Sequence, residues 1–133
     1  SRKEQIKLGN TKYPYEYIIY EQEKELEREP QQYNLTQQVT EAAIRYIKSN
    51  ENSPFFLYLA HPMPHMPVYA STDFQGKSAR GKYGDTVEEL DWSVGQILQT
   101  LKSEGLDKTH WLFSHPIMGH GFYVNKKEDH RVR

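Results

Sequence analysis

Cysteine is absent from this chain of 133 residues, so it can form neither a disulfide nor a thiolate metal site. An excess of charge of one sign is also missing, because 17 basic and 18 acidic residues give a formal net charge of −1. This balance argues against a nucleic-acid or anionic-membrane partner. No apolar run reaches the roughly 18 residues of a membrane-spanning helix. We therefore expect one ordinary domain with no membrane span.

The most informative stretch is residues 54–67, where an apolar run is followed at once by a proline-rich loop. The run Phe55-Phe56-Leu57-Tyr58-Leu59 is too short for a helix and predicts a strand buried on both faces, as in a parallel sheet. Three prolines between positions 62 and 67 then prevent a strand or helix from continuing. Open α/β sheets bind ligands at the carboxyl ends of their strands. We therefore look for a site in this loop.

Two histidines, His61 and His65, make the loop chemically interesting. Their four-residue spacing would suit a metal on a helix, but the intervening prolines exclude a helix, and no acidic residue in the loop completes a ligand set. We expect no metal site built from this chain alone. A histidine beyond a strand end can donate an N–H to an oxyanion. For His61 the sequence favours a buried histidine bonded to the backbone, whereas for His65 it favours a ligand contact.

Residues 1–16 are polar with turn signals, and we expect them to be irregular. Residues 17–20 are β-prone and lead into the charge-dense residues 21–29, which end at Pro30. The pattern leaves two structures open for this segment, a solvated hairpin or a frayed helix.

Two helices frame the apolar strand. Asn34 with Gln37 predicts an N-cap, and an apolar stripe at helical spacing follows it, made by Val39, Ala43 and Ile47 with Ala42 and Tyr46. The second helix is predicted from about Tyr83 to Glu104 by a stripe of Val87, Leu90, Val94, Ile97, Leu98 and Leu101.

The ends of the second helix carry their own signals. Asp85, Glu88 and Glu89 lie near its start, where the helix dipole favours acidic groups. Gly105 followed by Leu106 predicts a glycine C-cap. The order helix, strand, loop, helix indicates the α/β class. Phe74 lies between the loop and this helix and is expected to anchor a surface segment.

Several motifs together resemble the sulfatase family, of the arylsulfatase type within the alkaline-phosphatase-like superfamily. The resemblance runs from about Tyr17 to Lys108. It rests on residues 54–67 and on two further motifs in the same order, Gly81-Lys82-Tyr83-Gly84-Asp85 within residues 76–85 and Val87-Glu88-Glu89-Leu90-Asp91-Trp92-Ser93-Val94-Gly95.

The resemblance implies an alkaline-phosphatase-like sandwich with a mainly parallel sheet. It also implies hydrolysis of a sulfate ester, on a small molecule or a glycan, with a formylglycine nucleophile and a calcium ion. In such enzymes the histidine at the position of His65 contacts the substrate sulfate, and His61 takes a supporting role. Family habit favours export to the periplasm, the lysosome or the medium.

This chain also departs from the family pattern. Formylglycine is made from Cys or Ser in a Cys/Ser-x-Pro-x-Arg motif, and Ser114-His115-Pro116-Ile117-Met118 ends in Met rather than Arg. The paired aspartates that begin a sulfatase and bind its calcium are missing. We therefore expect an internal fragment, with a partial catalytic domain at residues 1–108, that is catalytically inactive alone.

Residues 109–133 do not match the family pattern and are expected to be an irregular tail. The protein sequence of residues 108–121 can be back-translated into its possible codons. If each new codon then starts on the third base of an old one, the possible translations include Asn-Thr-Leu-Val-Ile-Phe-Thr-Ser-Asp-Asn-Gly-Pro-Trp. That sequence resembles the family strand whose Asp-Asn pair binds metal. We hypothesise that the loss of one base near the codon of Lys108 shifted the frame of this tail.

Two other functions stay open at this point. The same superfamily contains phosphodiesterases and phosphonate hydrolases, and sulfate and phosphate esters share their geometry. A small non-catalytic interaction domain is supported only by the absence of a nucleophile and of metal ligands.

Overall fold

The computed structural model describes residues 17–117 and 119–126, with the side chains of residues 17–113. Along the chain the elements are β1 (Ile18–Glu21), β2 (Lys24–Arg28), the 3₁₀ turn η1 (Gln32–Asn34), α2 (Leu35–Ser49), β3 (Phe56–Ala60), α3 (Gly81–Ser103), β4 (His110–Ile117) and β5 (Gly119–Lys126). Helices and strands together confirm the α/β class. The expectation for residues 1–16 lies outside the described residues.

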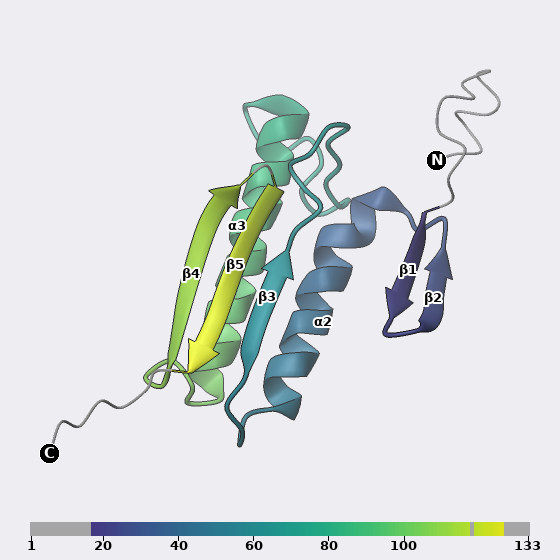
Figure 1. The fold of residues 1–133 in the computed structure, drawn as a ribbon. Coiled ribbons are helices and arrows are strands. Elements are labelled where there is room, and N and C mark those ends of the chain that lie inside the picture. The colour runs from purple at the N-terminus through teal and green to yellow at the C-terminus, as the bar shows by residue number, and fades with distance from the viewer. Residues whose placement is uncertain (1–16, 118, 127–133) are drawn as a thin grey trace, which may run out of the picture.

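The charge-dense segment forms a β-hairpin rather than a frayed helix. β1 and β2 pair antiparallel, with Ile18 opposite Arg28 and Glu21 opposite Lys24. Arg28 Nη2 lies 2.6 Å from Glu25 Oε2 on the exposed side of β2. In Figure 1 this hairpin lies beside α2, on the side away from the larger sheet.

Helix α2 begins where the sequence predicted, but its N-terminus is stabilised differently. Asn34 occupies the N-cap position without a side-chain capping hydrogen bond. The amide of Gln37 donates instead to Ser71 Oγ at 3.2 Å, so the capping box was a wrong prediction. The side chain of Gln37, which the capping box would use locally, instead makes a tertiary contact with the distant loop that contains Ser71. The buried stripe is confirmed at Ala43 and Ile47.

Helix α3 starts at Gly81, slightly before the predicted Tyr83, and ends at Ser103. Leu90, Ile97 and Leu101 of its predicted stripe are buried. The glycine C-cap is confirmed: Gly105 has φ +69°, and the amide of Leu106 donates to Leu101 O at 2.7 Å. This is the hydrogen bond that a Schellman cap requires.

The larger sheet has the strand order β3-β5-β4, and both of its pairings are antiparallel. A mainly parallel sheet was expected, so the described pairings differ from that expectation. The reason is that β5 folds back from β4 and lies between β4 and β3. Strands β3 and β4 still run in the same direction, since each is antiparallel to β5.

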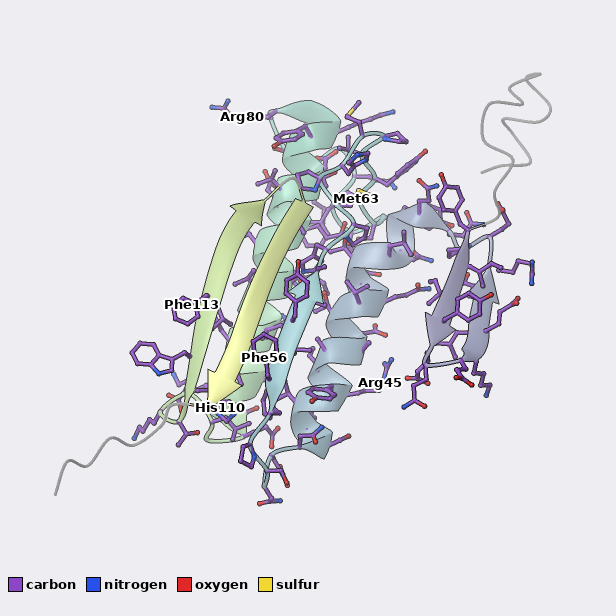
Figure 2. The ribbon with its side chains drawn as sticks, viewed as in Figure 1. Arg45, Phe56, Met63, Arg80, His110 and Phe113 are labelled. Carbon is purple, nitrogen blue, oxygen red and sulfur yellow. The ribbon has the colours of Figure 1, made fainter. Side chains whose placement is uncertain are left out.

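Burial of β3 on both faces was a wrong prediction. Leu59 is buried, whereas Phe56 and Tyr58 on the opposite face are 57% and 52% exposed. Helices α2 and α3 cover only one face of the sheet, as Figure 1 shows. Trp111 and Phe113 of β4 are also exposed, and the labelled Phe56 and Phe113 project from the uncovered face in Figure 2.

The prediction of an irregular tail was also wrong, because residues 110–117 and 119–126 form strands. Leu112 packs against the core, so the apolar run at the start of β4 alternates between the two faces. Pro116 does not prevent pairing because β4 is an edge strand, where a missing amide hydrogen can be tolerated.

The core lies between the two helices and the sheet. Its buried residues come from α2, α3, β3 and their flanking turns: Ala43, Ile47, Phe55, Leu59, Ile97, Leu101 and Leu106. The ring of Phe55 stacks on His110 with centroids 4.6 Å apart, which ties the start of β3 to the start of β4. Within the described residues, no helix has both the length and the apolar character needed to cross a bilayer.

Candidate functional site

His61 follows β3 directly and is buried, with 5% of its surface exposed. Its Nε2 lies 3.2 Å from Ser93 Oγ on α3. Ser93 Oγ lies 2.6 Å from Thr40 Oγ1, which donates to Thr36 O on α2. The expected burial of His61 is therefore found, and its partner is a side chain on α3. Through Ser93 and Thr40, His61 joins the end of β3 to both helices.

His65 lies four residues further along the loop and is exposed. Met63, two residues before it, is buried at 4% exposure. The peptide bonds Met63-Pro64 and Met66-Pro67 are cis. The structure thus separates the two histidines, with His61 inside the protein and His65 available to a ligand.

Asp85 was expected at the start of the second helix, but it lies one turn inside α3, which has no acidic residue in its first turn. Its two carboxylate oxygens accept hydrogen bonds from the loop before the helix, Oδ2 from Gly76 N at 2.9 Å and Oδ1 from Ser78 N at 2.8 Å. These backbone hydrogen bonds hold the pKa of Asp85 below its usual value of 3.8. The carboxylate of Asp85 is therefore stabilised by the backbone amides of the preceding loop rather than by the helix dipole.

Glu89 is fully buried one helical turn further along α3. Its Oε2 accepts a hydrogen bond from Ser71 N at 2.9 Å. Its Oε1 has no hydrogen-bond partner among the described residues. Burial raises the pKa of Glu89 above the usual 4.5, and the amide and hydroxyl of Ser71 partly oppose that rise.

The sequence analysis gave no role to Ser71 or Ser93, and it explained Glu89 only by the helix dipole. The sequence does contain a signal for two of them. Asp85, Glu89 and Ser93 are spaced by four residues beside the apolar stripe, so they share one face of α3. A polar residue on the edge of a buried stripe indicates a buried hydrogen bond, but its partner cannot be read from the chain.

Two hollows lie near these elements. One of about 390 Å³ lies beside the loop and the start of α3, and its lining includes Tyr69, Lys82 and Asp85. A larger, mainly apolar one of about 520 Å³ lies between the β1–β2 hairpin, α2 and the core side of β3. Neither contains His65, which stands on the loop surface.

The part of the chain that the structure describes contains no cluster of three or more acidic, histidine or cysteine side chains able to hold a metal ion. The sequence also contains no Cys-x-Pro-x-Arg or Ser-x-Pro-x-Arg motif from which formylglycine could form. The described residues therefore do not fit a calcium site or a formylglycine nucleophile.

Together these features define an α/β unit in which a sheet strand ends in an exposed histidine loop braced by a long helix. The profile of the sulfatase family matches residues 3–114. The chain therefore belongs to the sulfatase family, whose members generally use calcium and formylglycine.

Curated relatives agree with this assignment. Mouse N-acetylgalactosamine-6-sulfatase is 49% identical over 82 residues, covering 60% of this chain and 16% of the relative. Human steryl-sulfatase is 49% identical over 78 residues, covering 58% of this chain and 13% of the relative. Human arylsulfatase D is 34% identical over 88 residues, covering 66% of this chain and 14% of the relative. The chain thus matches only about one sixth or less of the length of these relatives.

Proposed function

We propose that this chain is the part of a sulfuric ester hydrolase that presents one sulfate-binding histidine, His65. Family membership and the exposure of His65 beyond the carboxyl end of β3 carry the proposal. A neutral imidazole offers one N–H donor and an imidazolium offers two, and both suit a sulfate oxygen. His61 supports the loop from inside the protein.

In this proposal the nucleophile and the paired calcium-binding aspartates belong to other parts of the complete enzyme, and the Asp-Asn pair belongs to the alternative frame of the tail. The chain alone supplies neither the formylglycine precursor nor an acidic ligand cluster among its described residues. The substrate is a sulfate ester of a small molecule or a glycan. We therefore expect the isolated chain to bind weakly and to hydrolyse nothing.

Activity assays on the complete enzyme and on the isolated chain test this function. The complete enzyme, with the original reading frame restored after Lys108, should hydrolyse 4-nitrophenyl sulfate, and the 133-residue chain should not. His65→Ala in the complete enzyme should lower turnover on the order of 10²-fold, as the loss of one oxyanion donor does. Lys48→Ala, on an exposed position at the far end of α2, is the control and should keep full activity.

Three results would count against the proposal. Hydrolysis by the isolated chain above its own His65→Ala variant would show that it carries its own nucleophile. A complete enzyme that cleaves 4-nitrophenyl phosphate but not the sulfate ester would favour the phosphodiesterase alternative. Unchanged turnover in His65→Ala would remove the role of that histidine.

The proposal extends to the tail. If one base was lost near the codon of Lys108, the metal-binding Asp-Asn pair lies in the alternative frame of residues 109–121. Sequencing the DNA of the locus is expected to show an A-rich run at this codon, with Asp-Asn-Gly readable in the alternative frame. An unambiguous reading frame with no such sequence would contradict the frameshift.

A further inference from the structure

One face of α3 contacts three separate points of the segment between β3 and α3. Asp85, Glu89 and Ser93 form this face, which we call the anchor face. All three are buried, at 4%, 0% and 0% exposure. They follow one another at intervals of four residues, so they stand about 6 Å apart along the helix axis.

Two of these contacts fix the ends of the loop that carries His65. Ser93 contacts His61 at 3.2 Å, where β3 ends, and Glu89 accepts from Ser71 N at 2.9 Å. Residues 62–70, which we call the histidine loop, therefore leave and return to α3 within about one helical turn. Ser71 also accepts a hydrogen bond from Gln37 of α2, so its end is held by both helices.

The hydrogen-bond chain at the start of the histidine loop requires a proton on Nε2 of His61. Thr40 has one hydroxyl proton and gives it to Thr36 O, which can only accept. Ser93 must then donate to Thr40 Oγ1, 2.6 Å away. Ser93 Oγ has no second proton, so it accepts from His61 Nε2–H. The geometry therefore places a proton on Nε2, and in the neutral imidazole this selects the Nε2–H tautomer.

The inside of the histidine loop is packed and its tip is free. Met63 and Ala70 are buried at 4% and 5% exposure, whereas His65 is exposed. Asp85 holds the following residues 76–78 through two backbone amides. A loop with fixed ends and a packed interior has few conformations available to its tip, so less entropy is lost when the tip binds a ligand.

We infer that Ser93 and Glu89 are positioning residues that set the place of His65 by closing the histidine loop on α3. This inference rests on the proposed role of His65 in binding sulfate. It assigns to α3 a function in the site, although no residue of the helix needs to touch the substrate.

Nuclear magnetic resonance of the ¹⁵N-labelled 133-residue chain tests the inference. In the unmodified chain, His61 should carry its proton on Nε2. Ser93→Ala removes the acceptor, so His61 should become a mixture of both tautomers, and the signals of His65 should shift or split. Glu89→Ala should speed exchange of the Ser71 amide with solvent by at least about 10-fold, while amides within α2 and β3 keep their protection.

Conservative and neighbouring variants separate positioning from general damage. Glu89→Gln keeps an oxygen that can accept from Ser71 N, so it should restore protection of the Ser71 amide and the His65 signals. Glu88→Ala, at an exposed neighbouring position, should change neither. If Glu89→Ala unfolds the chain, the inference is tested with Ser93→Ala alone, by measuring the tautomer of His61 and the signals of His65.

Several outcomes would overturn the inference. They are an Nε2 of His61 that carries no proton in the unmodified chain, unchanged His65 signals in Ser93→Ala, and equal protection of the Ser71 amide with and without the Glu89 carboxyl. None of these measurements uses sulfate or turnover. A failure of the proposed hydrolase activity is therefore distinguishable from a failure of this positioning role.

Discussion

Ile97→Ala is expected to lower the free energy of unfolding of this chain by about 2–5 kcal/mol. Ile97 is completely buried on α3, in the core cluster that includes Ile47 of α2 and Leu59 of β3. Removing its side chain takes apolar contacts from both helices and the sheet and leaves a cavity that the core can only partly fill. Urea denaturation followed by circular dichroism measures the change.

Leu98→Ala is the matched control, because Leu98 is the next residue on the same helix and is 50% exposed. It removes most of the same side-chain volume from a position where solvent can fill the space, so the free energy of unfolding should change by about 0.5 kcal/mol or less. Equal losses in Ile97→Ala and Leu98→Ala would show that α3 does not pack in the described orientation.

Gly84→Ala is expected to lower the free energy of unfolding by about 1–3 kcal/mol, although alanine is the better helix former. A Cβ at this position would lie 2.2 Å from Ser78 Oγ, 2.8 Å from Ser78 Cβ and 2.9 Å from Arg80 Cβ. Ser78 N donates to Asp85, so the clash acts on the segment that Asp85 holds. Denaturation gives the loss of stability, and amide exchange of Ser78 should accelerate.

Gly95→Ala is the control for this substitution. Gly95 lies on the same helix and is exposed, and a Cβ added to it would meet no other part of the described chain within 4 Å. With no clash, the gain in helix propensity should raise the free energy of unfolding by about 0.5–1 kcal/mol. If Gly84→Ala stabilised the chain as Gly95→Ala does, the close approach of α3 to residues 78–80 would be contradicted.

Local sequence patterns predicted the helices well. The apolar stripes of α2 and α3 recur at helical spacing, and Gly105 with Leu106 forms the expected cap, since these signals act within a few residues. The same locality explains why the charge-dense segment is compatible with two structures when its sequence is considered alone. Only the pairing of β1 with β2 decides between the two structures, and the sequence of one strand does not specify which segment it pairs with.

Predictions that depended on distant partners were less successful. The apolar run of β3 was expected to be buried on both faces, but helices cover one face and leave Phe56 and Tyr58 exposed. The tail was expected to be irregular because it does not match the family pattern, yet pairing with β5 makes residues 110–117 an edge strand. In both cases the neighbours, rather than the residues themselves, determined the outcome.

The sequence by itself determined the family, the helices and the position of His65 beyond a strand, because motif order and apolar periodicity are properties of the chain alone. Only the tertiary structure showed that Ser93 holds His61 and that Glu89 holds Ser71. These pairs are separated by 32 and 18 residues. A polar side chain on a helix indicates that it needs a partner, but only the packing of the loop against α3 supplies that partner.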